Sequence, residues 1–124
     1  MKSITFLFIA VFFQVFLCRT IEFSGIVTCD HPHYCYQLKY WEEDNIEDDY
    51  VIETGTHCSK KPSTKTSVVA EHGWDASFHY EFYMFVYHNC TEFGNFTTFR
   101  HNFTDIPATQ TVKVKYELDI TDRE

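Results

Sequence analysis

Residues 111–120 read Thr-Val-Lys-Val-Lys-Tyr-Glu-Leu-Asp-Ile. Apolar and charged side chains alternate here with a period of two, which predicts a β-strand with one buried and one solvated face. Residues 34–41 alternate in the same way but carry aromatic side chains on both faces. Residues 78–88 form a longer run with aromatic or apolar side chains on both faces. That composition predicts a central strand that is covered on both sides.

Shorter strand candidates lie at residues 23–29, 50–54, 67–71 and 96–103. Between the candidates are breaks rich in Gly, Pro and polar residues, at 30–33, 54–64, 72–76, 91–95 and 105–109. Several short strands with little helical periodicity predict an all-β chain folded as an antiparallel β-sandwich. We see no internal repeat or linker, so we expect one folded domain.

The N-terminus has the pattern of a secretory leader. Lys2 precedes a 14-residue apolar run at positions 4–17, interrupted by Thr5 and Gln14. This run has the length of a signal-peptide apolar region and is too short to cross a bilayer. We expect cleavage between Cys18 and Ile21, which makes residues 1–20 a signal peptide and residues 21–124 a secreted, extracellular domain.

The charge balance excludes one class of partner. The chain has a formal net charge of -8, and removal of Lys2 and Arg19 with the leader makes it -10. A protein that binds nucleic acid by neutralising phosphates needs excess positive charge, so we expect no nucleic-acid partner. No later apolar run approaches 18 residues, so we expect no transmembrane segment.

The cysteines fit an oxidising compartment. Four of the five remain after the leader, at positions 29, 35, 58 and 90. An even set in a secreted domain predicts two disulfides, and three connectivities are open from the residues alone. The alternative is a metal site, because Cys29, His31, His33 and Cys35 lie within seven residues of one another. Zinc sites usually separate two ligand pairs by a dozen or more residues, which favours the disulfides.

Several segments resemble the nematode transthyretin-like family. Residues 23–29, Phe-Ser-Gly-Ile-Val-Thr-Cys, resemble its opening strand, and residues 83–90, Tyr-Met-Phe-Val-Tyr-His-Asn-Cys, resemble its most diagnostic segment. Residues 38–44, 105–107 and 116–120 resemble its second strand, its late Ile-Pro and its closing strand. The chain departs from the family at residues 72–75, which replace the usual Asp-Gly-aromatic turn, and it lacks the family's further cysteine after the His-Asn-Cys segment.

The resemblance implies a transthyretin-like (prealbumin-like) sandwich in which Cys29 pairs with Cys90, leaving Cys35 for Cys58. It also implies a non-catalytic binding protein that takes a lipid, a small hydrophobic molecule or a protein at cell surfaces or in extracellular fluid. Some members of the family are understood to bind phosphatidylserine. An acidic domain would need a bridging cation to approach such a lipid.

Two related folds remain as alternatives. An immunoglobulin-like interaction module would explain Cys29, Trp41 and Cys90, although its corner tyrosine is expected where this chain has His88. The second alternative is the hydroxyisourate hydrolase relative of transthyretin. Its active site is a cluster of His and Arg side chains that is completed by a C-terminal Tyr-Arg-Gly-Ser. This chain ends instead in Thr-Asp-Arg-Glu, so we expect no such enzyme activity.

Residues 42–53 contain seven acidic residues and no basic one. A run of this kind is ordinarily a solvated loop. The functional alternative is calcium, because hard cations take clustered carboxylate oxygens. The candidate ligands are Asp44, Glu47, Asp48 and Asp49, and no other cofactor is expected.

Three glycosylation acceptors follow one another at Asn89, Asn95 and Asn102, each with Thr two positions later. In a strand at 96–103, Phe99 and Phe103 would point inward and Asn102 outward, which permits a glycan there. Asn89 competes with the disulfide at Cys90, so we expect it to be the least occupied.

Candidate partner-binding residues are the aromatics Trp41, Trp74 and Tyr83, together with His88 from the Tyr-His-Asn-Cys segment. Aromatic side chains are common in interfaces and also in cores. For His88 a structural role at the end of a strand is the favoured interpretation.

Overall fold

The computed structural model describes residues 18–73, 79–107, 109 and 111–124. This part of the chain is all-β, and no helix in it is long and apolar enough to span a bilayer. Its strands are β1 (Cys18–Thr28), β2 (Tyr34–Glu42), β3 (Asp49–Glu53), β4 (His57–Ser59), β5 (Ser63–Gly73), β6 (His79–Tyr80), β7 (Phe82–His88), β8 (Thr97–Asn102), β9 (Ile106–Pro107) and β10 (Thr111–Asp119).

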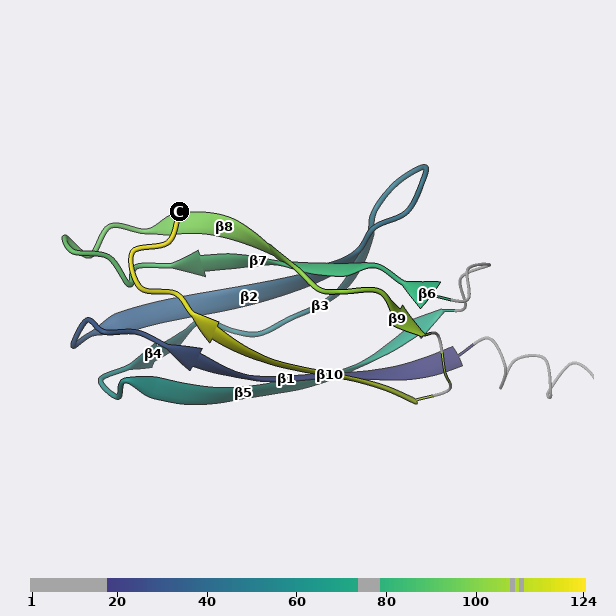
Figure 1. Ribbon diagram of the computed structural model, residues 1–124, viewed down its shortest axis with the longest axis horizontal. Helices are drawn as coiled ribbons and strands as arrows, with labels where there is room; N and C mark the ends of the chain where they lie inside the picture. Colours follow the sequence, from purple (N-terminus) through teal and green to yellow (C-terminus); the bar gives the residue numbers. More distant parts are fainter. Residues whose placement is uncertain (1–17, 74–78, 108, 110) are drawn as a thin grey trace, which may run out of the picture.

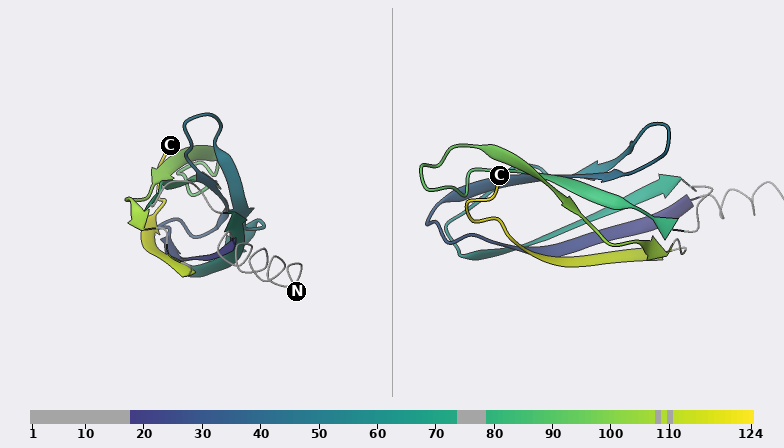
Figure 2. Two further views of the ribbon diagram at one scale, coloured as in Figure 1. Left: turned by 90° about the vertical axis from the view of Figure 1, so that its right-hand side faces the viewer. Right: turned by 45° about the horizontal axis from the view of Figure 1, so that its top comes forward.

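Two main sheets pack face to face (Figure 1). One has the order β10-β1-β5, and the larger one has the order β3-β2-β7-β8 with β4 also paired to β2. A third, two-stranded sheet joins β6 to β9. The end-on view in Figure 2 shows the two main sheets enclosing a common interior. The pairings are antiparallel except for that of β1 with β10, which is parallel. This pairing corrects the expectation of a purely antiparallel sandwich.

The core follows from the period of two in each strand. On β2, Tyr34, Tyr36, Leu38 and Tyr40 are buried, which identifies the inward face of a strand whose pattern left both faces open. Phe23 of β1 stacks on Tyr40 across the interior, with ring centroids 4.1 Å apart. Such aromatic pairs contribute about 1 kcal/mol beyond the area they bury. The interior therefore gains its packing from rings supplied by both sheets.

The predicted strands are present, with different bounds. β1 and β5 are longer than the predicted strands 23–29 and 67–71, and β5 runs through part of the break predicted at 72–76. The run 78–88 divides into β6 and β7. The short strands β4 and β9 fall in segments predicted as breaks. Residues 1–17 of the predicted leader lie outside the described residues, and β1 begins at Cys18.

The hallmark of an immunoglobulin domain is a Trp packed against the disulfide between the sheets, and Trp41, the tryptophan within the described residues, does not take that place. Asn89, beside Cys90, donates its backbone N–H to the Cys35 carbonyl at 3.2 Å, so the Cys29–Cys90 disulfide lies near the start of β2. Trp41 lies at the other end of that strand, opposite Tyr83. Six residues of extended chain separate Cys35 from Trp41 by about 20 Å.

Candidate functional site

The solvent side of the larger sheet carries a group of aromatic side chains. We call it the outer aromatic face, and it consists of Trp41, Tyr50, Tyr83, Phe85, Tyr87 and Phe96. The ladder places Trp41 opposite Tyr83 on one side and opposite Tyr50 on the other. Phe85 and Tyr87 follow Tyr83 at alternate positions of β7, so all three point away from the core.

Four of these rings are substantially open to solvent. Phe85, Tyr50, Tyr87 and Phe96 are between 37% and 49% exposed, whereas Tyr83 is 4% exposed. The strand β7 is therefore central in its sheet but is not covered on both sides, which corrects the sequence prediction. A period of two shows that both faces are apolar, but it does not show whether a second layer exists to cover the outer one.

Two cations lie over the rings. The Lys39 ammonium is 5.2 Å from the Trp41 ring centroid and 5.4 Å from that of Tyr50, and the Arg100 guanidinium is 3.6 Å from that of Tyr83. Lys39 and Arg100 are also the two ladder partners of Phe85, so a cation stands on each side of this exposed ring. The face is therefore aromatic, with two cations that each have an acidic neighbour, Glu53 beside Lys39 in the ladder and Glu43 3.8 Å from Arg100.

Tyr83 connects the face to the acidic loop between β2 and β3. Its hydroxyl donates a 2.5 Å hydrogen bond to Asp48. Desolvation and this bond raise the pKa of Tyr83 to about 12, and the same bond lowers the pKa of the Asp48 carboxyl. Asp48 also accepts the backbone N–H of Asp44 at 3.1 Å. The carboxylate thus holds the loop against the end of the sheet.

The structure does not support the calcium hypothesis. No group of three or more His, Cys, Asp or Glu side chains in the described ranges is placed to hold a metal ion. The predicted ligands Asp44, Glu47, Asp48 and Asp49 do not converge, because Asp48 is directed at Tyr83 and Asp44 caps Asn45 locally. The loop interpretation of the acidic run holds for residues 43–48 alone. Glu42 is buried at the end of β2, and residues 49–53 form β3.

Both disulfides are present. Cys29 pairs with Cys90, as the family resemblance implies, and Cys35 pairs with Cys58, the pair that was left by elimination. The alternative metal site at residues 29–35 therefore has no free thiolate. The first bridge is buried and joins Cys29, directly after β1, to Cys90, two residues after the end of β7. The second joins directly opposed residues of β2 and β4, with Cys58 exposed.

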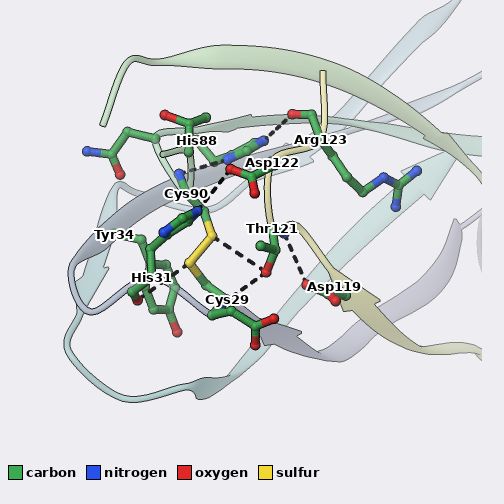
Figure 3. The surroundings of a disulfide bond; sticks show 12 residues. Cys29, His31, Tyr34, His88, Cys90, Asp119, Thr121, Asp122 and Arg123 are labelled. Carbon is green, nitrogen blue, oxygen red and sulfur yellow. Dashed lines mark hydrogen bonds and ion pairs between the residues drawn. A yellow bond between two sulfur atoms is a disulfide. The ribbon is translucent and has the colours of Figure 1, made fainter. Parts of the chain in front are cut away.

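His88 has a structural role beside the buried disulfide (Figure 3). Its Nε2 bonds to the Arg123 carbonyl at 2.7 Å and its Nδ1 accepts the Cys90 backbone N–H at 3.0 Å, which fixes a neutral tautomer. Burial lowers the pKa of His88. The side chain is inaccessible, so it is not available as a partner-binding group.

The remaining candidates are distributed differently. Trp41 and Tyr83 belong to the outer aromatic face, and Trp74 lies outside the described residues. Asn95 and Asn102 are exposed. Asn89 is half-buried and its Oδ1 accepts the Cys35 backbone N–H at 2.6 Å.

Sequence reasoning missed most of this face. It did not single out Phe85, Tyr87, Phe96, Tyr50 or the two cations. The signal was the alternation of residues 82–88, which placed Tyr83, Phe85 and Tyr87 on one side of the strand.

Residues 24–124 match the family described as Caenorhabditis elegans protein of unknown function (DUF870). The chain belongs to this family. No curated protein matches the chain. The DUF870 match begins within β1 and includes both disulfides and the whole outer aromatic face, so these features lie inside the segment that defines the family.

Proposed function

We propose that this DUF870 chain is a secreted, non-catalytic binding protein of transthyretin-like type, and that its outer aromatic face binds a protein partner in extracellular fluid or at a cell surface. The observation that carries the proposal is the set of half-exposed rings on a rigid sheet, with Lys39 and Arg100 among them. Protein interfaces are enriched in Tyr, Trp, Phe and Arg at their centres. A monomer seldom leaves such a group uncovered without a function.

The covalent framework supports the extracellular location. Two disulfides in a short chain are typical of oxidising compartments, and the N-terminal apolar run has the pattern of a leader. The transthyretin-like assignment draws support from the Cys29–Cys90 pairing, which the resemblance required.

A non-catalytic role is supported by the state of His88. Both of its ring nitrogens are engaged by backbone groups, and the side chain is buried. Incubation of the purified protein with hydroxyisourate tests the enzyme alternative directly, and turnover above the spontaneous rate would overturn the non-catalytic assignment.

The test of the binding face uses a matched pair of variants. One replaces Phe85 and Tyr87 by Ser, and the control replaces Val69 by Ser, because Val69 is 57% exposed on the outer side of the other main sheet. The secreted wild-type chain is used to capture partners from nematode extracellular fluid, and the captured protein is then purified and titrated against all three chains.

We expect the double variant to weaken binding at least about 30-fold, which corresponds to the loss of about 2 kcal/mol at an interface centre. We expect the Val69→Ser chain to bind as the wild type does. Equal binding by the double variant and the wild type would refute the assignment of the face.

A lipid partner is the competing outcome. Vesicles of phosphatidylcholine, with and without phosphatidylserine, are tested in calcium and in chelator. The secreted chain, whose net charge is -10 without Lys2 and Arg19, is repelled by the anionic vesicles that contain phosphatidylserine. Vesicles of phosphatidylcholine alone offer no net charge to attract it, so we expect no binding to either vesicle. Retention on vesicles that Phe85→Ser/Tyr87→Ser abolishes would replace the protein partner by a lipid one.

A further inference from the structure

Asn102 lies at the end of β8, opposite Tyr83 in the ladder and on the same side of the sheet as the outer aromatic face. A glycan here covers the Tyr83 end of that face, so the partner of the proposed function binds the end that carries Tyr87 and Phe96. Its side chain is exposed, and its Oδ1 accepts a hydrogen bond from Arg100 Nε at 2.7 Å. Arg100 is itself held by stacking on Tyr83 and by its proximity to Glu43, 3.8 Å away. The amide oxygen of Asn102 is thus fixed, and its Nδ2 is left toward solvent.

A hollow of about 270 Å³ opens beside this amide. Its lining consists of the charged residues Glu43, Glu81, Arg100 and Asp105, of Asn102 itself, and of Phe82 and Phe103. Three carboxylates and a guanidinium form a wall rich in hydrogen-bond acceptors and donors. This chemistry suits a neutral polyhydroxylated ligand that carries an amide, and it suits an apolar ligand poorly.

We propose that Asn102 carries an N-linked glycan and that the first N-acetylglucosamine residue lies in this hollow. Transfer from a polyprenyl-diphosphate oligosaccharide forms a bond from sugar C1 to Nδ2. It breaks the bond from C1 to the diphosphate oxygen, and one Nδ2 proton is lost. The Oδ1 acceptor is unchanged, so the bond from Arg100 persists in the product. The carboxylates accept hydrogen bonds from sugar hydroxyls, and Arg100 donates to them.

The other two acceptor sites provide a comparison. Asn95 lies in the exposed loop between β7 and β8, so a glycan there extends into solvent. Asn89 is bonded to the Cys35 backbone and is followed by a cysteine of the buried disulfide. We therefore expect a glycan at Asn102 to stabilise the fold, a glycan at Asn95 to leave stability unchanged, and Asn89 to be unmodified.

The inference rests on the secretory route of the proposed function, so the test separates the two. The full chain is expressed in mammalian cells with its own N-terminus and, in parallel, behind a heterologous leader. Cells are treated to keep glycans high-mannose, and glycopeptide mass spectrometry maps the occupied sites. If Asn102 is glycosylated behind the heterologous leader but not behind the chain's own N-terminus, the secretory assignment is refuted and the glycan site is supported. Secretion with Asn102 unmodified would refute the site alone.

Stability tests the seating of the sugar. Thr104→Ala removes the acceptor site while keeping Asn102 and its bond to Arg100, and Asn95→Gln is the matched control. We expect Thr104→Ala to lower Tm by about 4 °C, Asn95→Gln to leave Tm unchanged, and trimming to a single N-acetylglucosamine with endoglycosidase H to keep the full Tm.

Glu81→Gln separates seating from a general glycan effect. We expect it to lower Tm in the glycosylated chain and to have no effect in the Thr104→Ala background, since the contact partner is then missing. Equal Tm values for wild type and Thr104→Ala, or an equal effect of Glu81→Gln in both backgrounds, would refute the proposal.

Discussion

Gly25 provides space in the interior for a tyrosine of the neighbouring strand. A Cβ at this position would overlap the ring of Tyr116, its ladder partner on β10. The Tyr116 hydroxyl lies 2.5 Å from the Tyr40 hydroxyl of the opposite sheet, and burial raises the pKa of Tyr116 to about 12. The absence of a side chain at position 25 therefore permits a polar contact between the two sheets.

We expect Gly25→Ala to lower the free energy of unfolding by about 2 kcal/mol, because overpacking forces the tyrosine off its position. Gly55→Ala is the control, since a Cβ there meets no atom within 4 Å. Urea denaturation of both variants measures the difference. Equal stabilities would contradict this account of Gly25.

His88 gives the fold a dependence on pH. Burial is the main cause of its lowered pKa, and burial lowers the pKa of His101 as well. In the unfolded chain both imidazoles take up protons when the pH falls below their ordinary pKa of 6.5, whereas in the folded chain they stay neutral at that pH. Stability is thus fully present above pH 6.5 and is lost as the pH falls toward the folded pKa values.

We expect the urea concentration at the midpoint of unfolding to decrease when the pH is lowered from 7.5 to 5.5. The carboxyl groups of Asp48 and Asp119 also have lowered pKa values, but their unfolded forms titrate near 3.8 and so contribute only at lower pH. We expect His88→Gln to make the urea midpoint depend less steeply on pH. A midpoint that rises on acidification would contradict the neutral assignment.

Among the elements, the two disulfides differ in access. Cys29 and Cys90 are buried at the junction of β1 and β7, whereas the β2–β4 bridge has an exposed sulfur-bearing residue, Cys58. A reducing thiolate must reach a sulfur to attack it. We expect low concentrations of dithiothreitol to open Cys35–Cys58 first, as shown by alkylation and peptide mass mapping. Earlier labelling of Cys29 or Cys90 would contradict the assignment.

The loops that the bridges close also differ in length. They span 61 and 23 residues, so chain entropy gives about 4 and about 3 kcal/mol respectively. We therefore expect the Cys35→Ser/Cys58→Ser chain to remain folded and to lose about 3 kcal/mol of its free energy of unfolding. Loss of the fold in that variant would assign the β2–β4 bridge a larger role than its position indicates.

Local sequence pattern predicted the strands where burial alternates strictly. The run 111–120 became β10 almost to the residue, and Phe99 and Asn102 took the predicted sides of β8. The strands β4 and β9 were not predictable, because two or three residues carry too little periodicity. The parallel pairing of β1 with β10 joins residues about 90 positions apart, so it depends on packing of the whole chain. The outer aromatic face was not predictable from the pattern of single strands, because the pattern does not say which sheet has no second layer over its outer side.

Across the whole molecule, the two outer faces are unlike. The outer side of the β10-β1-β5 sheet carries charges of both signs, with Glu22 beside Lys113 in the ladder and Ile26 beside Glu117. The larger sheet instead presents rings with Lys39 and Arg100. We expect the net negative charge to oppose association of copies of the chain at neutral pH, even though an apolar surface is open.

This balance predicts self-association on acidification. The pI of the full sequence is about 5.2, and loss of Lys2 and Arg19 with the leader lowers the pI of the secreted chain below that value. Near its pI the repulsion between copies vanishes while the rings remain exposed. We expect sedimentation velocity to show a monomer at pH 7.4 and concentration-dependent oligomers near pH 5. The Phe85→Ser/Tyr87→Ser chain is expected to stay monomeric at both pH values, whereas Val69→Ser is expected to associate as the wild type does. Far-UV circular dichroism at pH 5 checks that all three chains remain folded there. Oligomers of the double variant under those conditions would assign the association to another surface.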